Sequence, residues 1–212
     1  FTLSENSPCL GTGQDGANMG AYGIGCYPET PDILWTNTYG TGDGWSGGRS
    51  VDETLDGGYI AIGYTGSDIS DIWIIKTDSN GDTLWTRTFG NSEGGAWGQY
   101  IQQTSDSSGY VVIGYKQNNG QEDIWLIKID SDGNEVSSET HGGDFNDWAA
   151  HGQETVDGGY VIAGTRGENN GDIWLIKTDY HGMEEWSQTF GGGNAESARY
   201  VQQTSDNGYI IT

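Results

Sequence analysis

A period of about 50 residues runs through this 212-residue chain and constrains its fold more than any other feature. A Gly-Tyr step followed by Ile or Val recurs at four positions, 51, 50 and 49 residues apart: Tyr59, Tyr110, Tyr160 and Tyr209. A second motif, Asp-Ile-Trp followed by Ile or Leu and then Ile-Lys, begins at Asp71, Asp123 and Asp172. Self-similarity at a fixed period of this length predicts a tandem array of one structural unit.

Each copy of the period predicts four short strands. In the second copy, runs rich in Val, Ile, Tyr, Trp and Thr are bounded by clusters of Gly, Asp, Asn and Ser, which is the pattern of strands and hairpins. The expected strands are 98–104, 110–115, 123–129 and 134–141, with a longer loop over 116–122. The second and third strands are apolar at successive positions, which indicates a sheet covered on both faces. No segment has the pattern of a helix.

A four-stranded unit of this length, buried on both faces and repeated in tandem, is typical of a β-propeller blade. We therefore expect an all-β chain with about three and a half blades. A propeller needs about four to eight blades to close, so the chain is expected to be a fragment of a larger ring or to close its ring with a second chain. Open propeller edges would also allow a homo-oligomer.

The period divides the chain into a non-repeat N-terminal segment, 1–30, and a repeat region, 31–212. Within the repeat region the copies cover approximately 41–90, 91–141, 142–191 and a partial 192–212. The first residues lack the basic and apolar regions of a signal peptide, and Phe1 is not an initiator, so we expect the chain to belong to a longer protein.

Charge excludes several classes of partner. The chain has 31 acidic and 8 basic side chains, giving a net charge of −23, and this argues against nucleic acid or an anionic membrane surface as a partner. No apolar run approaches the roughly 18 residues of a membrane-spanning helix, so we expect no membrane insertion. The two cysteines, Cys9 and Cys26, are predicted to form a disulfide in an oxidising compartment, with two separate buried thiols as the alternative.

Two resemblances add to this interpretation. Residues 3–13 and 15–23 resemble the closing segment of right-handed parallel β-helix domains of secreted bacterial proteins. From Ile33 onward, the Asp-Gly-Gly-Tyr and Asp-Ile-Trp-Leu-Ile-Lys-Thr-Asp motifs are similar to repeat modules of secreted or surface-anchored bacterial and archaeal multidomain proteins that are expected to be propellers. The resemblance implies a secreted or cell-surface location and supplies no catalytic motif.

The loops that leave each second strand and those that join successive copies vary most, and we expect them to form the functional face. The joining loops carry aromatic and acidic side chains suited to a glycan, with rings against sugar C–H faces and carboxylates accepting hydroxyl hydrogens. The predicted ligand-binding residues are Trp45, Trp97, Trp148, Asp43 and Glu93. The alternative is that these tryptophans only fill space between blades.

Asp144 and Asp147 are the candidate catalytic pair, because they lie in the loop that departs most from the period and are flanked by His141 and His151. Glycoside hydrolysis commonly uses two carboxyl groups about 5 to 10 Å apart. The alternative is that both are solvated loop acids. No nucleotide-binding, serine-hydrolase or zinc motif occurs.

No cofactor and no metal site are expected. The Asp-rich turns at 78–82 and 130–134 have Gly at the fourth position, where an EF-hand loop needs it at the sixth, so they are interpreted as hairpin turns, with calcium left as an alternative. Lys76, Lys128 and Lys177 share one position of the period, which favours a structural role over a catalytic one.

Three hypotheses follow. The leading one is an extracellular binding or scaffold propeller that presents an aromatic, acidic loop face to a polysaccharide or a surface protein and has no chemistry of its own. The second is a glycoside hydrolase or lyase that uses the loop carboxylates. The third is a structural unit of a surface fibre or adhesin.

Overall fold

The computed structural model describes residues 35–40, 45–66, 69–90, 94–168 and 171–212. Within these ranges the secondary structure consists of strands without any α-helix, so the predicted all-β fold is confirmed. A helix long and apolar enough to cross a membrane is therefore not found in these ranges either. The chain divides into two compact units, Phe1–Thr36 and Asn37–Thr212, and every strand belongs to the second unit.

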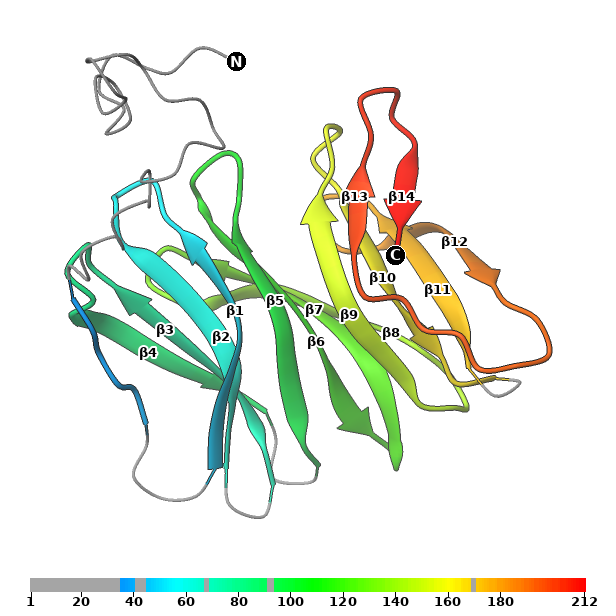
Figure 1. Ribbon diagram of the computed structural model, residues 1–212, viewed down its shortest axis with the longest axis horizontal. Helices are drawn as coiled ribbons and strands as arrows, with labels where there is room; N and C mark the ends of the chain where they lie inside the picture. Colours follow the sequence, from blue (N-terminus) through cyan, green and yellow to red (C-terminus); the bar gives the residue numbers. More distant parts are fainter. Residues whose placement is uncertain (1–34, 41–44, 67–68, 91–93, 169–170) are drawn as a thin grey trace, which may run out of the picture. The chain divides into compact units, whose positions relative to one another are not determined.

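Three four-stranded antiparallel sheets follow one another along the chain, each with its strands in sequence order (Figure 1). The first contains β1 (Trp45–Glu53), β2 (Tyr59–Gly66), β3 (Asp71–Thr77) and β4 (Thr83–Phe89). The second contains β5 (Ala96–Gln103), β6 (Gly109–Asn118), β7 (Gln121–Asp130) and β8 (Glu135–His141). The third contains β9 (Asp147–Glu154), β10 (Tyr160–Arg166), β11 (Asp172–Thr178) and β12 (Glu184–Phe190). A two-stranded sheet of β13 (Val201–Gln203) and β14 (Tyr209–Ile211) ends the chain.

The turn between the third and fourth strands of each sheet follows from local sequence. In the first sheet, a carboxylate oxygen of Asp78 accepts hydrogen bonds from the backbone N–H groups of Asn80 and Asp82. Gly81 has a φ of 80°, a conformation that glycine adopts without steric cost. The second and third sheets repeat this arrangement at Asp130 and Asp179. These segments are hairpin turns, as predicted.

One expected loop is absent. Residues 116–122 were predicted to form a longer loop, but β6 and β7 pair as far as Asn118 and Gln121 and are joined by Asn119 and Gly120 alone. Both linking residues have positive φ, 51° and 85°. Asn-Gly is the preferred sequence for a two-residue turn of this kind, because its twist matches that of the flanking strands. The prediction of a loop was wrong because Asn119 and Gly120 close the hairpin in two residues, so the polar residues on either side extend the two strands.

The core lies between successive sheets. In β6, Val112 belongs to the core shared with the first sheet, whereas Val111 and Ile113 belong to the core shared with the third. All three side chains are fully buried. Successive residues of a strand point to opposite faces, so a run of three apolar residues buries both faces of the middle sheet. A third core joins β10 and β11 to β13 and β14.

Candidate functional site

The first strands of the sheets share one irregularity in their pairing with the second strands. In β1, the register shifts between Gly48 and Ser50, which leaves Arg49 as the extra residue of a β-bulge. The shifts in β5 and β9 leave Gln99 and Ala150 in the same way. A bulge bends the strand and redirects one side chain, and bulges are frequent beside functional sites.

A fourth residue, Arg199, occupies the corresponding place before β13. The backbone N–H groups of Arg199 and Tyr200 both donate to the carbonyl oxygen of Thr212, at 2.6 and 3.3 Å. Two adjacent N–H groups that share one carbonyl oxygen give the two-against-one pairing of a bulge. All four residues lie five positions before a threonine that follows the strand: Thr54, Thr104, Thr155 and Thr204.

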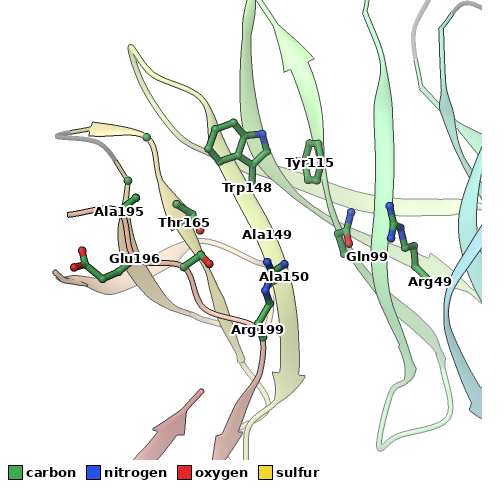
Figure 2. A pocket seen from close by; sticks show the side chains of 13 residues that line it. Arg49, Gln99, Tyr115, Trp148, Ala149, Ala150, Thr165, Ala195, Glu196 and Arg199 are labelled. Carbon is green, nitrogen blue, oxygen red and sulfur yellow. The ribbon is translucent and has the colours of Figure 1, made fainter.

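These four residues line one cavity of about 740 Å³ (Figure 2). The cavity takes residues from all three four-stranded sheets and from the segment before β13. Its size is within the usual range for a small-molecule site. The other residues of its wall are Tyr115, Trp148, Ala149, Thr165, Gly167, Gly171, Ala195, Glu196 and Ser197.

Polar and aromatic contacts fix one wall of the cavity. The ring of Tyr115 stacks on that of Trp97, with centroids 5.2 Å apart. Burial, together with the nearby charge of Glu122, raises the pKa of the Tyr115 hydroxyl, so the group is neutral and can donate a hydrogen bond at neutral pH. Tyr115 and Gln99 both line this part of the cavity.

Trp148 supplies an aromatic wall whose orientation is also fixed. Its indole Nε1–H donates a hydrogen bond to a carboxylate oxygen of Glu122. This contact holds the half-buried ring in place and gives the indole its hydrogen-bond partner. The Glu122 backbone N–H in turn donates to the side-chain oxygen of Asn146 at 3.0 Å, so the support continues into the segment before β9.

The structure does not bring the three predicted tryptophans together. Trp148 lines the cavity, Trp97 packs behind Tyr115 and does not line it, and Trp45 is 79 % exposed at the start of β1. The predicted ligand-binding residues Asp43 and Glu93 lie outside the described residues. So do the two cysteines of the predicted disulfide, Cys9 and Cys26.

Asp144 and Asp147 have different surroundings. Asp144 is exposed, whereas Asp147 is 2 % exposed and one of its carboxylate oxygens accepts a hydrogen bond from the Gly167 N–H at 3.0 Å. Burial raises the pKa of Asp147, and the Gly167 N–H opposes this effect. Neither carboxyl group lines the cavity. Asp147 thus anchors the segment after β10, where Gly167 forms part of the cavity wall.

The flanking histidines do not form a site with this pair. His151 is buried between two rings, with centroids 4.2 Å from Tyr100 and 3.9 Å from Tyr200. Its Nδ1 accepts a hydrogen bond from the Val201 N–H at 3.4 Å, so it joins β9 to β13. Across the described ranges, His, Cys, Asp and Glu form no group of three or more that could hold a metal ion.

Sequence reasoning missed Arg49, Gln99 and Arg199. Each of them lies five residues before the threonine that follows its strand, and this common distance could have identified them. The residue type at this position varies among Arg, Gln and Ala. The signal is weak because a bulge residue has no partner on the neighbouring strand. It therefore interrupts the alternation of apolar and polar residues that identifies a strand in a sequence. The arrangement offers two guanidinium groups, an amide, three hydroxyls, one carboxylate and an indole face, which are hydrogen-bonding and stacking groups.

Comparisons with known proteins give no further assignment, since no protein-family model matches this chain and no curated protein matches it significantly.

Proposed function

We propose that Asn37–Thr212 is part of an extracellular β-propeller whose cavity at the first strands binds a saccharide. The ring is supported by the packing of the described sheets. Each four-stranded sheet buries its second and third strands against the next sheet, and the first strands of successive sheets contact one another. First strands that meet in this way are those that line the centre of a propeller.

Residues before β1 provide a second argument for a ring. The side-chain amide of Asn37 donates to the Gly81 carbonyl oxygen at 2.7 Å. Fifty residues later, the Arg87 guanidinium on β4 donates to the Asp132 carbonyl oxygen at 2.6 Å, in the corresponding turn of the next sheet. Asn37 and Tyr39, which both donate to the Gly81 carbonyl oxygen, thus contact the first sheet as β4 contacts the second. This contact supports the proposal that they belong to the outer strand of a preceding blade.

The observation that carries the binding proposal is the composition of the cavity. Side chains redirected by bulges reach it from successive sheets, and Trp148, Gln99 and Thr165 add an indole face, an amide and a hydroxyl. Sugars are recognised by such a combination, because their C–H faces pack on aromatic rings and their hydroxyls exchange hydrogen bonds with amides and hydroxyls. The resemblance to secreted repeat modules supports the extracellular setting.

The test is an incubation of the purified chain with a panel of soluble and insoluble polysaccharides, in which both bound protein and newly released reducing ends are measured. We expect binding without release. Trp148→Ala should weaken binding at least about tenfold, as expected for losing a buried aromatic contact. Trp45→Ala is the matched control, because Trp45 is exposed and does not line the cavity.

Two outcomes would contradict the proposal. Equal binding by the wild-type chain and by a folded Trp148→Ala variant would exclude the cavity as the site, and Gln99→Ala provides a second variant if Trp148→Ala does not fold. Release of reducing ends that stops in Asp144→Asn or Asp147→Asn would instead establish a hydrolase.

A further inference from the structure

We propose that the cavity selects a saccharide that carries a carboxylate, and that Arg49 and Arg199 bind this group. The inference rests on the proposed function, since it names the class of saccharide that the same cavity takes. The inference comes from Arg49 and Arg199, which are the first and the last of the four bulge residues along the chain. Arg49 reaches the cavity from β1 and Arg199 from the segment before β13, with the shorter side chains of Gln99 and Ala150 at the two bulges between (Figure 2).

The two arginines differ from the other two because their guanidinium groups have neither a hydrogen bond nor a salt bridge in the part of the chain that the structure describes. Arg87 donates to the carbonyl oxygens of Thr86 and Asp132, and Arg166 pairs with Glu168 at 3.4 Å. By contrast, no hydrogen bond or salt bridge of the Arg49 or Arg199 guanidinium occurs among the described residues.

This lack of partners matters because acidic groups are abundant. The chain has 31 acidic residues and only four arginines, so an arginine on its surface has many carboxylates available to it. Two of the four arginines instead project into one cavity. The Arg49 guanidinium lies 5.5 Å from the centroid of the Tyr64 ring, a cation–π contact that positions the side chain and leaves its N–H groups available.

A carboxylate is the ligand group that these side chains fit best. The guanidinium has five N–H donors in a planar fork that matches two carboxylate oxygens, and such charge-assisted bonds are stronger than those between neutral groups. One carboxylate also lines the cavity, that of Glu196, and it accepts a hydrogen bond from the Gly192 N–H at 3.3 Å. The net charge of −23 disfavours anions over the chain as a whole, so the attraction for a carboxylate in this cavity has to come from the two arginines.

The remaining wall favours a sugar acid over an acidic peptide. The Trp148 ring is held by Glu122, and Gln99 and Thr165 present an amide and a hydroxyl. The indole face suits the C–H face of a sugar ring, and the amide and the hydroxyl suit its hydroxyl groups. An acidic peptide is therefore treated as an alternative that the experiment must exclude.

The experiment uses a matched pair of ligands. One is a xylo-oligosaccharide with a single glucuronic acid side group, and the other is the same compound after reduction of that carboxyl to a primary alcohol. Affinities are measured by calorimetry for the wild-type chain, for Arg49→Gln, for Arg199→Gln and for the double variant. Arg87→Gln is the control, because it removes the same charge away from the cavity. Acetylated tetraglutamate tests the peptide alternative.

We expect the wild-type chain to bind the acidic compound at least about tenfold more tightly than the reduced one. Each arginine variant should lower this ratio, the double variant should abolish it, and the affinity for the reduced compound should stay unchanged. Arg49→Lys and Arg199→Lys should retain part of the preference, because the charge remains and the planar fork does not. Arg87→Gln should behave as the wild-type chain.

The outcomes separate this inference from the proposed function. Equal affinity of the wild-type chain for both compounds would overturn the inference and leave saccharide binding intact. Tighter binding of tetraglutamate than of the acidic saccharide would also overturn it. If neither these compounds nor any member of the polysaccharide panel bound, the proposed function itself would fail. Melting temperatures of all variants show whether a lost preference reflects unfolding.

Discussion

The Nζ of Lys76 lies 2.9 Å from a carboxylate oxygen of Asp56, and this ion pair links β3 to the turn after β1. Lys76 is only 2 % exposed, whereas more than half of the Asp56 side chain is exposed. Asp56 also accepts hydrogen bonds from the Thr54 hydroxyl and the Gly58 N–H. These bonds, first that of Thr54 and then that of Lys76, lower the pKa of Asp56 to about 2.

Asp56→Asn should therefore destabilise the chain by about 2 kcal/mol, because it leaves a buried ammonium group without its counter-charge. The amide oxygen can still accept the bonds from Thr54 and Gly58. Asp206→Asn is the matched control, since Asp206 accepts the same two bonds from Thr204 and Gly208 and has no lysine partner among the described residues. Denaturant unfolding of both variants gives the difference. An equal cost for the two substitutions would show that the ion pair contributes nothing.

His151 should make stability depend on pH. Burial lowers its pKa from 6.5 to about 4 in the folded chain. Between pH 4 and pH 6.5 the histidine therefore binds a proton more readily in the unfolded chain than in the folded chain. The contribution of His151 to the free energy of unfolding is fully present above about pH 6.5 and is lost as the pH falls towards 4. The loss is on the order of 2 kcal/mol. Burial also lowers the pKa of His141, which adds to the effect in the same direction.

The measurement compares unfolding free energies at pH 7.5 and 4.5. We expect His151→Gln to be less stable than the wild-type chain at pH 7.5 and to lose less stability on acidification. His181→Gln should keep the wild-type pH dependence, because His181 is exposed in a turn. An unchanged pH dependence in His151→Gln would refute the assignment.

The Asn119-Gly120 turn should be sensitive to a side chain at its second position. Gly120 has a φ of 85° and no atom within 4 Å of where a Cβ would stand, so Gly120→Ala adds backbone strain without a clash. The expected cost is about 1 kcal/mol in unfolding free energy. Gly143→Ala, where the space is equally open and φ is not positive, should cost less. Equal costs at both positions would contradict the role assigned to φ.

Much of the fold could be predicted from local signals. The apolar runs of β6 and β7 and the turn at Asp130 mark strands and a hairpin in any structure that the chain adopts, because alternation and turn chemistry act over a few residues. The Asn119-Gly120 turn carries such a signal as well, because Asn-Gly is a preferred sequence for a two-residue hairpin turn. The candidate site was harder to predict. Trp97 and Trp148 share a position of the period, yet only Trp148 lines the cavity.

The sequence by itself determined the all-β class, the four-strand unit and the two-faced burial of the middle sheet, since these depend on the period and on residue type. Only the tertiary structure decided where the cavity lies and what lines it. Arg49 and Arg199 are 150 residues apart, and they line one cavity because successive sheets pack face to face and each first strand is bulged at the same level. The direction of a bulged side chain depends on how the strand bends against its neighbours, and that is a property of the packed sheets.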